Sequence, residues 1–193
     1  MDDGYVLVVG SAGIDVKGRP QEAVKWEAPN QGQVRTSVGG VARNIAENLA
    51  HLEVPIKLLT AIGDDFAGDQ VLEVCEDAGL DCENVRQISE GRTGTYMALL
   101  KPDGQLHASV SDFEIMHHVD SDYLLEHETL FQDAQMVVID ASLDAAALET
   151  LFELTTRHKI RVVADPTTPV LASRLCPYIS QMYMVVPNAD ETA

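Results

Sequence analysis

The stretch SVGGVARN, residues 37–44, decides how the rest of this chain is interpreted. Gly39 and Gly40 precede a helical pattern that runs from Val41 to about Leu52. Glycine tolerates a positive φ and lets a ligand approach the backbone closely. The first N–H groups of a helix lack partners inside the helix, so a polar ligand can accept hydrogen bonds from them. With Asn44 one turn further on, the stretch indicates either a site for a hydroxyl-rich or anionic ligand or a tight turn with an N-terminal cap.

Short apolar runs alternate with helical patterns along the chain. Unbroken apolar runs are typical of strands buried on both faces of a parallel sheet. Alternating strands and helices predict an α/β fold with a doubly wound parallel sheet. The expected strands are Tyr5–Gly10, Ile56–Ile62, Met136–Asp140, Arg161–Asp165 and Met182–Pro187.

Polar side chains follow several of these runs. Asp15, Asp140, Asp165 and Asn188 lie at or just past the expected strand ends. In doubly wound sheets the ligand crevice lies outside the carboxyl ends of the strands. Asp15 is therefore either an acceptor for sugar hydroxyls or an ordinary turn residue, because an ionised carboxylate accepts hydrogen bonds and donates none.

Two further segments differ from the core pattern. Residues 17–36 are polar and contain glycine and proline, whereas residues 94–110 show alternating strands joined by a hairpin-like turn. We expect the two segments to pair into a small secondary sheet over the site.

The composition restricts the class of partner. Thirteen Lys and Arg against 31 Asp and Glu give a net charge of −18. Such a surface repels nucleic-acid backbones and anionic membranes, so neither is an expected partner. The N-terminus lacks the basic start of a signal peptide, and three cysteines without metal-type spacing fit reduced thiols. We therefore expect a cytoplasmic protein.

Four motifs in this order resemble those of the PfkB/ribokinase family of sugar and nucleoside kinases. They are GSAGID at residues 10–15, GGVARNIA at 39–46 with the later Gly63, GDDFAG at 63–68, and Asn188-x-x-Glu191. The resemblance implies a ribokinase-like doubly wound parallel sheet with a small β lid formed by segments about 17–36 and 94–110. It also implies that residues 1–193 are the N-terminal portion of the kinase domain, with the C-terminal part missing. Glu53, where a glycine usually ends the first helix, and Gly13, where several members have Asn, depart from the family pattern.

The resemblance also implies a set of site residues. The sugar hydroxyls would lie among Asp15, Gly39, Gly40 and Asn44; Thr95 and Asp112 would be lid residues near the base; and Asn188 and Glu191 would position Mg²⁺, its waters and the ATP phosphates. No residue of this chain is expected to bind the metal directly. Arg43 either reaches a phosphate or base or is a solvent-facing helix residue.

Within the family, the runs VVGSAGIDV at residues 8–16 and GGVARNIAENLA at 39–50 are similar to those of pseudouridine kinases. The implied function is the substrate-binding part of an ATP-dependent kinase for the 5′-hydroxyl of a nucleoside, with pseudouridine as the leading candidate. The family's anion hole and Asp base follow the Asn188-x-x-Glu191 motif, so we expect no catalytic residue in this chain and no activity from it alone. The alternatives are a kinase for ribose, fructose or another nucleoside, and a non-catalytic sugar- or nucleoside-binding module. A homodimer formed through the lid is a further implication.

Overall fold

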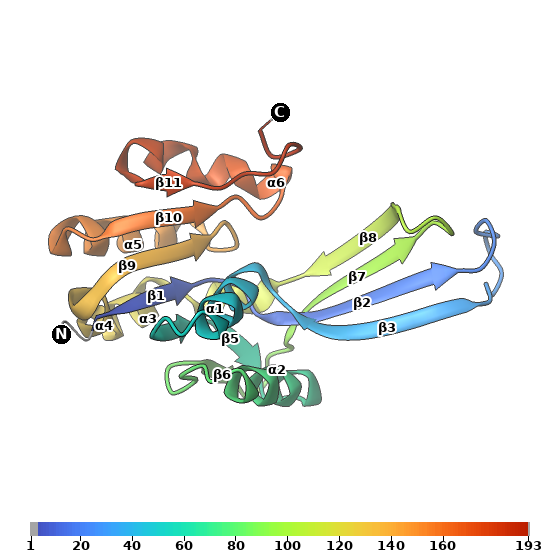
Figure 1. Ribbon diagram of the computed structural model, residues 1–193, viewed down its shortest axis with the longest axis horizontal. Helices are drawn as coiled ribbons and strands as arrows, with labels where there is room; N and C mark the ends of the chain where they lie inside the picture. Colours follow the sequence, from blue (N-terminus) through green and yellow to red (C-terminus); the bar gives the residue numbers. More distant parts are fainter. Residues whose placement is uncertain (1–3, 193) are drawn as a thin grey trace.

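A five-stranded parallel sheet, the core sheet, lies at the centre of a computed structural model that describes residues 4–192 (Figure 1). Its strand order is β11-β10-β9-β1-β4, and every pairing is parallel. Its strands are β1 (Tyr5–Val9), β4 (Ile56–Leu59), β9 (Ala134–Asp140), β10 (Arg161–Asp165) and β11 (Met184–Val185). The prediction of a parallel sheet is confirmed.

Helices cover both faces of the core sheet. The side chains of Leu7 and Val9 pack into one apolar cluster and that of Val8 into another, and all three are fully buried. Successive strand residues point to opposite faces, which explains why the strand is apolar without interruption. One cluster includes α1 (Val41–His51) and α2 (Phe66–Asp77); the other includes α3 (Ser121–Glu126), α4 (Glu128–Asp133) and α5 (Ala145–His158).

A second sheet of four strands, the lid sheet, projects from the core as an arm, at the right of Figure 1. Its order is β3-β2-β7-β8, with β2 parallel to β7 and the outer pairs antiparallel. Its strands are β2 (Gly13–Pro20), β3 (Gly32–Gly39), β7 (Gly94–Leu100) and β8 (Leu106–Asp112). The two segments expected to pair do lie in one sheet, in which β2 and β3 are regular eight-residue strands.

Two of the expected strands differ in the structure. The run Ile56–Ile62 divides at Thr60, because the chain leaves the core sheet there and β5 (Ala61–Gly63) pairs with β6 (Arg86–Ile88) in a separate two-stranded sheet. The backbone amide of Arg86 donates to the Thr60 carbonyl at 2.9 Å and fixes the division. The run Met182–Pro187 keeps only the two residues of β11, the edge strand beside β10. The connections also contain η1 (Glu114–His118), α6 (Pro169–Ala172) and η2 (Ser173–Gln181).

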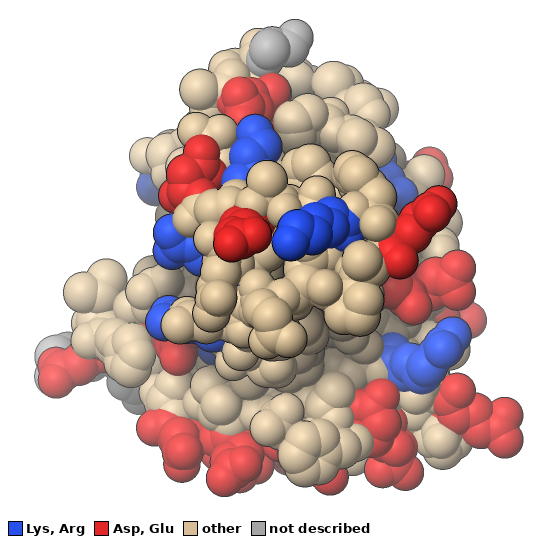
Figure 2. Space-filling view, turned by 90° about the vertical axis from the view of Figure 1, so that its right-hand side faces the viewer, with Lys and Arg blue, Asp and Glu red and all other residues tan. Residues whose placement is uncertain are grey.

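Charged side chains are scattered over the lid end of the molecule. Figure 2 shows isolated Lys and Arg side chains in the middle of this face and Asp and Glu along the lower edge, the side on which α2 lies in Figure 1. Within residues 4–192, no helix combines the length and the apolar character needed to cross a membrane.

Candidate functional site

The order of the core sheet reverses between β1 and β9. From β1 the chain proceeds to β4 on one side, and later to β9, β10 and β11 on the other. A doubly wound sheet binds its ligands at the carboxyl ends of strands where the order reverses in this way. Ser11, just after β1, and Asp140, the last residue of β9, lie at this point and are hydrogen-bonded to each other.

Gly39 and Gly40 bring the end of β3 against the segment that follows β1. Gly40 has a φ of 93°, and a Cβ there would lie 2.5 Å from the Cα of Ala12. A Cβ at Gly39 would lie 2.5 Å from Oδ1 of Asp15. Gly40 therefore requires glycine, whereas a side chain at Gly39 would displace the Asp15 carboxylate, which lies directly against the glycine turn. We call Asp15, Gly39, Gly40 and Asn44 the acceptor clamp.

The first N–H groups of α1 are not available to a ligand. Val41 donates to Ser11 Oγ (3.0 Å), Ala42 to Asp140 Oδ2 (3.1 Å) and Arg43 to the Ser11 carbonyl (3.1 Å). Asn44 donates to the Gly40 carbonyl at 2.9 Å. The sequence-based hypothesis that a ligand accepts from these helix donors is wrong, because the protein itself satisfies all four of them.

Arg43 has neither of the two roles expected from the sequence. It is only 3% exposed, and its guanidinium folds back onto the carbonyls of Gly39 (3.1 Å) and Val38 (3.2 Å). It also forms an ion pair with Glu47 at 2.9 Å and donates to Oδ1 of Asn44. That contact orients the Asn44 amide so that its nitrogen is the atom left to donate. The clamp thus combines a carboxylate acceptor from Asp15 with an amide donor from Asn44, a pair suited to hydroxyl groups.

The strand register divides the predicted lid residues between two faces. Asp15 lies in a row with Ser37, Tyr96 and Ser111, and we call this side the Asp15 face. Thr95 and Asp112 are one residue away from that row, so their side chains point to the opposite face. There Thr95 donates to the Thr93 carbonyl at 3.2 Å, and Asp112 accepts from the Glu114 amide at 3.4 Å.

The structure therefore does not bring Thr95 and Asp112 together with Asp15. It places Tyr96 beside Asp15 and Ser111 next along the same row, each one residue from the Thr95 and Asp112 expected from the sequence. The alternation of side chains along each strand could have distinguished Tyr96 and Ser111 from Thr95 and Asp112 only if the pairing of β2, β7 and β8 had been known.

Asn188 and Glu191 form a reciprocal hydrogen-bonded pair. The Asn188 side chain donates to Oε1 of Glu191 at 2.6 Å and accepts from the backbone amides of Asp190 and Glu191. Oε2 of Glu191 accepts from the Asn188 amide at 2.9 Å. This is the pattern of a capping box, so the two side chains are held together past β11, with Asn188 exposed and Glu191 half-buried.

Asp165, at the end of β10, lies near this pair. Burial raises the pKa of Asp165 above its ordinary value, and the charges of Glu191 and Asp140 raise it further, although the Thr167 amide opposes the shift. Within residues 4–192, no group of three or more His, Cys, Asp and Glu side chains is arranged to hold a metal ion. The oxygen atoms of Asn188 and Glu191 nevertheless fit a hydrated Mg²⁺, which usually keeps several of its waters.

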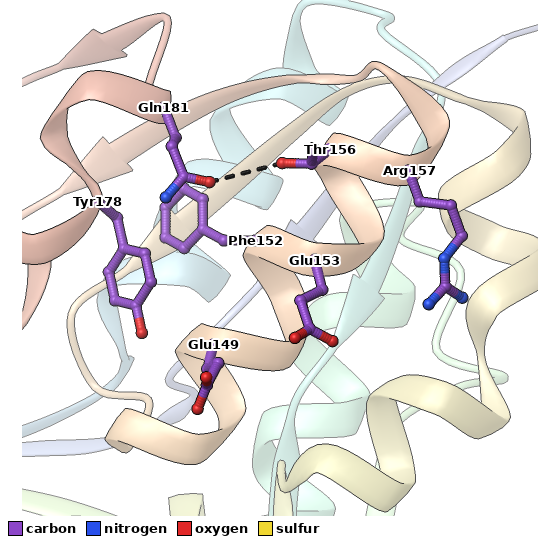
Figure 3. A pocket seen from close by; sticks show the side chains of 7 residues that line it. All are labelled: Glu149, Phe152, Glu153, Thr156, Arg157, Tyr178 and Gln181. Carbon is purple, nitrogen blue, oxygen red and sulfur yellow. Dashed lines mark hydrogen bonds between the residues drawn. The ribbon is translucent and has the colours of Figure 1, made fainter.

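A separate hollow lies between α5 and η2 (Figure 3). Its volume is about 510 Å³, and the rings of Phe152 and Tyr178 stack in it with centroids 4.4 Å apart. Glu149, Glu153, Thr156, Arg157 and Gln181 complete its lining. None of the predicted site residues contributes to it, so the candidate site remains at the carboxyl ends of β1 and β9.

The fold is that of an α/β protein with a doubly wound parallel core sheet and a projecting lid sheet, and the candidate site lies where β1 and β9 end. Residues 3–193 match the model of the pfkB family of carbohydrate kinases, and the chain belongs to this family. Pseudouridine kinase of Escherichia coli is 30% identical over 187 residues, which cover 97% of this chain and 59% of that protein.

Solved structures agree on the fold. A carbohydrate kinase from Agrobacterium tumefaciens superimposes with a TM-score of 0.87 at 24% identity, over 97% of this chain and 62% of that one. The ribokinase of Arabidopsis thaliana, solved with ribose and ATP, gives a TM-score of 0.76 at 18% identity, over 97% of this chain and 61% of that one. The chain thus spans about three fifths of the length of these proteins.

Proposed function

We propose that this chain provides the acceptor-binding part of an ATP-dependent kinase that phosphorylates the 5′-hydroxyl of a nucleoside. The observation that carries the proposal is the acceptor clamp, in which Asp15 and Asn44 flank a glycine turn at the carboxyl ends of β1 and β9. The carboxylate would accept from one sugar hydroxyl, and the amide would donate to another. Membership of the pfkB family supports the reaction class.

The electrostatics of the clamp favour an uncharged acceptor. The N-terminal end of a helix attracts anions through its free N–H groups and its dipole. In α1 those groups are occupied, and the carboxylate of Asp140 already lies at this helix end. Asp15 adds a second carboxylate beside Gly39, and this carboxylate is paired with Lys17 at 3.0 Å. A neutral polyol fits this environment better than a sugar phosphate does.

The lid supports a nucleoside over a free sugar. Tyr96 lies next to Asp15 on the Asp15 face and is only partly buried. An aromatic ring at that place offers a stacking surface for a base, whereas ribose and fructose have no flat group to use it. The name of the E. coli relative makes pseudouridine the leading candidate.

ATP and Mg²⁺ would bind on the side of Asn188 and Glu191. These two residues would hold the hydrated ion through its waters, close to the phosphates. The metal supplies neutralisation of charge in a phosphoryl transfer that depends mainly on positioning and electrostatics. The lid sheet would exclude water, the competing acceptor, from the site.

Calorimetry with pseudouridine, uridine, ribose and fructose tests the proposal. We expect pseudouridine to bind most tightly, and Asn44→Ala to weaken it by about 1–3 kcal/mol through loss of a hydrogen bond. Asn48→Ala, one turn further along α1, is the matched control and should bind as the unaltered chain does. Equal affinity of the Asn44→Ala and unaltered chains would refute the assignment of the clamp.

We propose that residues 1–193 alone do not transfer a phosphoryl group. The family resemblance places the anion hole and the Asp base after the Asn188-x-x-Glu191 motif, and the 193 residues contain neither. Turnover of ATP and pseudouridine by this purified chain would refute this part. Activity of a chain extended to the length of its relatives would favour the kinase, whereas nucleoside binding without turnover in that longer chain would favour a binding module.

We also propose that two copies pair through the lid sheet. On the side opposite to the Asp15 face, the register places Thr36, Val16, Met97 and Val110 in one row and Val34, Gly18, Leu99 and Ala108 in the next. Val34 is 73% exposed and Val110 66%. These two rows hold no charged side chain, so two chains with a net charge of −18 can meet there with little repulsion.

A further inference from the structure

The carboxylate of Asp140 is fully buried and accepts five hydrogen bonds. Its Oδ2 atom accepts from the amide of Ser11 (2.9 Å), the hydroxyl of Ser11 (2.5 Å) and the amide of Ala42 (3.1 Å). Its Oδ1 atom accepts from the amide (3.0 Å) and the hydroxyl of Ser142. A buried charge held in this way stabilises whatever geometry satisfies it, because each lost partner leaves a costly unpaired group.

This carboxylate replaces the missing cap of α1. The N-cap position is Gly40, which has no side chain to cap the helix. Asp140, 98 residues away in the chain, supplies the acceptor for Ala42, and Ser11 supplies the acceptors for Val41 and Arg43. The first backbone donors of α1 are thereby fastened to the ends of β1 and β9, while the Arg43 side chain holds the preceding carbonyls of Val38 and Gly39.

The same contacts fix the clamp. The Ser11 hydroxyl donates to Asp140 and accepts from Val41, so it links the carboxylate to the residue directly after the glycine turn. Gly40 packs so closely on residues 11 and 12 that a Cβ would lie 2.5 Å from the Ser11 carbonyl oxygen. A shift of Ser11 would therefore move Gly39 and Gly40 relative to Asp15, and Asn44 would move with its helix.

We propose that Asp140 is a positioning residue of the acceptor clamp, acting through Ser11 and the first turn of α1 without touching the substrate. The expected effect of Asp140 on nucleoside affinity rests on the proposed function. The expected effect of Asp140 on the backbone of the clamp rests on the hydrogen bonds alone. The proposed role does not extend to Asp144, the other aspartate near the end of β9. The Asp144 carboxylate caps α5 by accepting from the Ala147 amide at 2.9 Å and has no hydrogen bond to the clamp.

The first test is binding, measured on the intact protein with pseudouridine and with ATP. Asp140→Asn replaces one acceptor oxygen by a donor that faces other donors, and we expect the Kd for the nucleoside to rise on the order of tenfold or more. The Kd for ATP should change less than twofold. Ser11→Ala, a milder change that removes only the linking hydroxyl, should shift the same constant in the same direction.

Asp144→Asn is the matched control, because it weakens a helix cap at the same edge of the sheet. We expect it to lower the melting temperature and leave both dissociation constants unchanged. The proposal is overturned if Asp140→Asn folds and binds the nucleoside as tightly as the unaltered protein. It is also overturned if nucleoside and ATP affinity fall together in proportion to stability, as a purely structural role would require.

The second test needs no ligand and keeps the inference separable from the proposed function. Hydrogen exchange of the Val41, Ala42 and Arg43 amides should be faster in Asp140→Asn and Ser11→Ala, while amides in the middle of α5 should exchange as before. If the unaltered protein binds no nucleoside, the proposed function fails, and this exchange pattern still decides whether Asp140 positions the clamp. Unchanged exchange at these three amides would refute it.

Discussion

The core sheet and the lid sheet are built from the same kind of hydrogen bonds, but they are stabilised in different ways. In the core sheet, Leu7, Val8 and Val9 are fully buried between two layers of helices. In the lid sheet, β8 is exposed along its whole length, and β3 is exposed except near its end at Gly39. Apolar burial therefore stabilises the core, whereas the lid depends on contacts at its base.

The base of the lid is small and closely packed. Ile14 and Val38 join the apolar cluster that includes α2. Asp65, the N-cap of α2, accepts from the amide (2.9 Å) and hydroxyl (2.7 Å) of Thr93, directly before β7 begins. Gly13 approaches so closely that a Cβ there would lie 2.2 Å from the Gly94 carbonyl oxygen. A few residues therefore determine how firmly the arm is attached.

The largest effect is expected from truncation in the core. Leu148 on α5 is fully buried, and Leu148→Ala should lower the free energy of unfolding by about 2–5 kcal/mol. Val110→Ala in the lid removes apolar atoms from a side chain that is 66% exposed, and it should cost less than about 0.5 kcal/mol. Chemical denaturation of both variants checks the contrast, and equal losses would show that the lid is buried in solution.

This contrast also explains how much could be predicted from the sequence. The uninterrupted apolar run around Val8 predicted a strand of the core sheet, because a strand that is buried on both faces has an apolar residue at every position. The division at Thr60 was missed, because a change of sheet within an apolar run leaves no sign in periodicity.

The candidate site follows the same logic. The sequence named the glycine turn and Asp15 because close approach requires glycine and because Asp15 follows the first expected strand, although the structure places Asp15 within β2. Asp140 was identified only as one of several strand-end residues, since its partners Ser11 and Ala42 are distant in the chain. The inward fold of Arg43 could not be predicted, because arginine on a short helix usually faces solvent.

The next largest effect should come from the attachment of the lid. Asp65→Ala removes the cap of α2 and both bonds to Thr93, so we expect a loss of about 1–3 kcal/mol. Amides of β7 should exchange faster, since the strand loses its fixed start. Asp120→Ala is the control, because Asp120 caps α3 by accepting from Tyr123 at 2.8 Å and lies outside the lid. Equal exchange of β7 in the two variants would show that Asp65 does not anchor the lid.

A smaller effect is expected from pH at the same residue. Burial alone would raise the pKa of Asp65, but hydrogen bonds from Thr93, Gly68 and Ala67 together lower it below its ordinary value. A lowered pKa in the folded state means that the stabilising contribution is present above the unfolded pKa, near 4, and is lost as the pH falls through the folded value.

The measurement compares the unaltered chain with Asp65→Asn, whose side chain does not titrate. The difference in free energy of unfolding between the two should be present at pH 7 and should shrink as the pH falls below about 4. Other carboxylates titrate in both proteins and cancel in the difference. A difference that is the same at pH 7 and pH 3 would contradict the assigned shift.

The smallest effect on stability is expected from substitutions in the two rows of the lid sheet that contain Val34 and Val110. These substitutions also test whether two copies of the chain assemble. Val34→Ser combined with Val110→Ser should change the free energy of unfolding of each subunit by about 0.5 kcal/mol or less, because both side chains are largely exposed. If these rows pair two copies, the variant should be monomeric at concentrations where the unaltered chain is a dimer, as measured by light scattering. Arg35→Ser is the matched control, because Arg35 neighbours Val34 on the same strand and points to the Asp15 face. A common mass for all three proteins would rule out pairing through this surface, and the lid would then depend only on its base and on the bound substrate for its order.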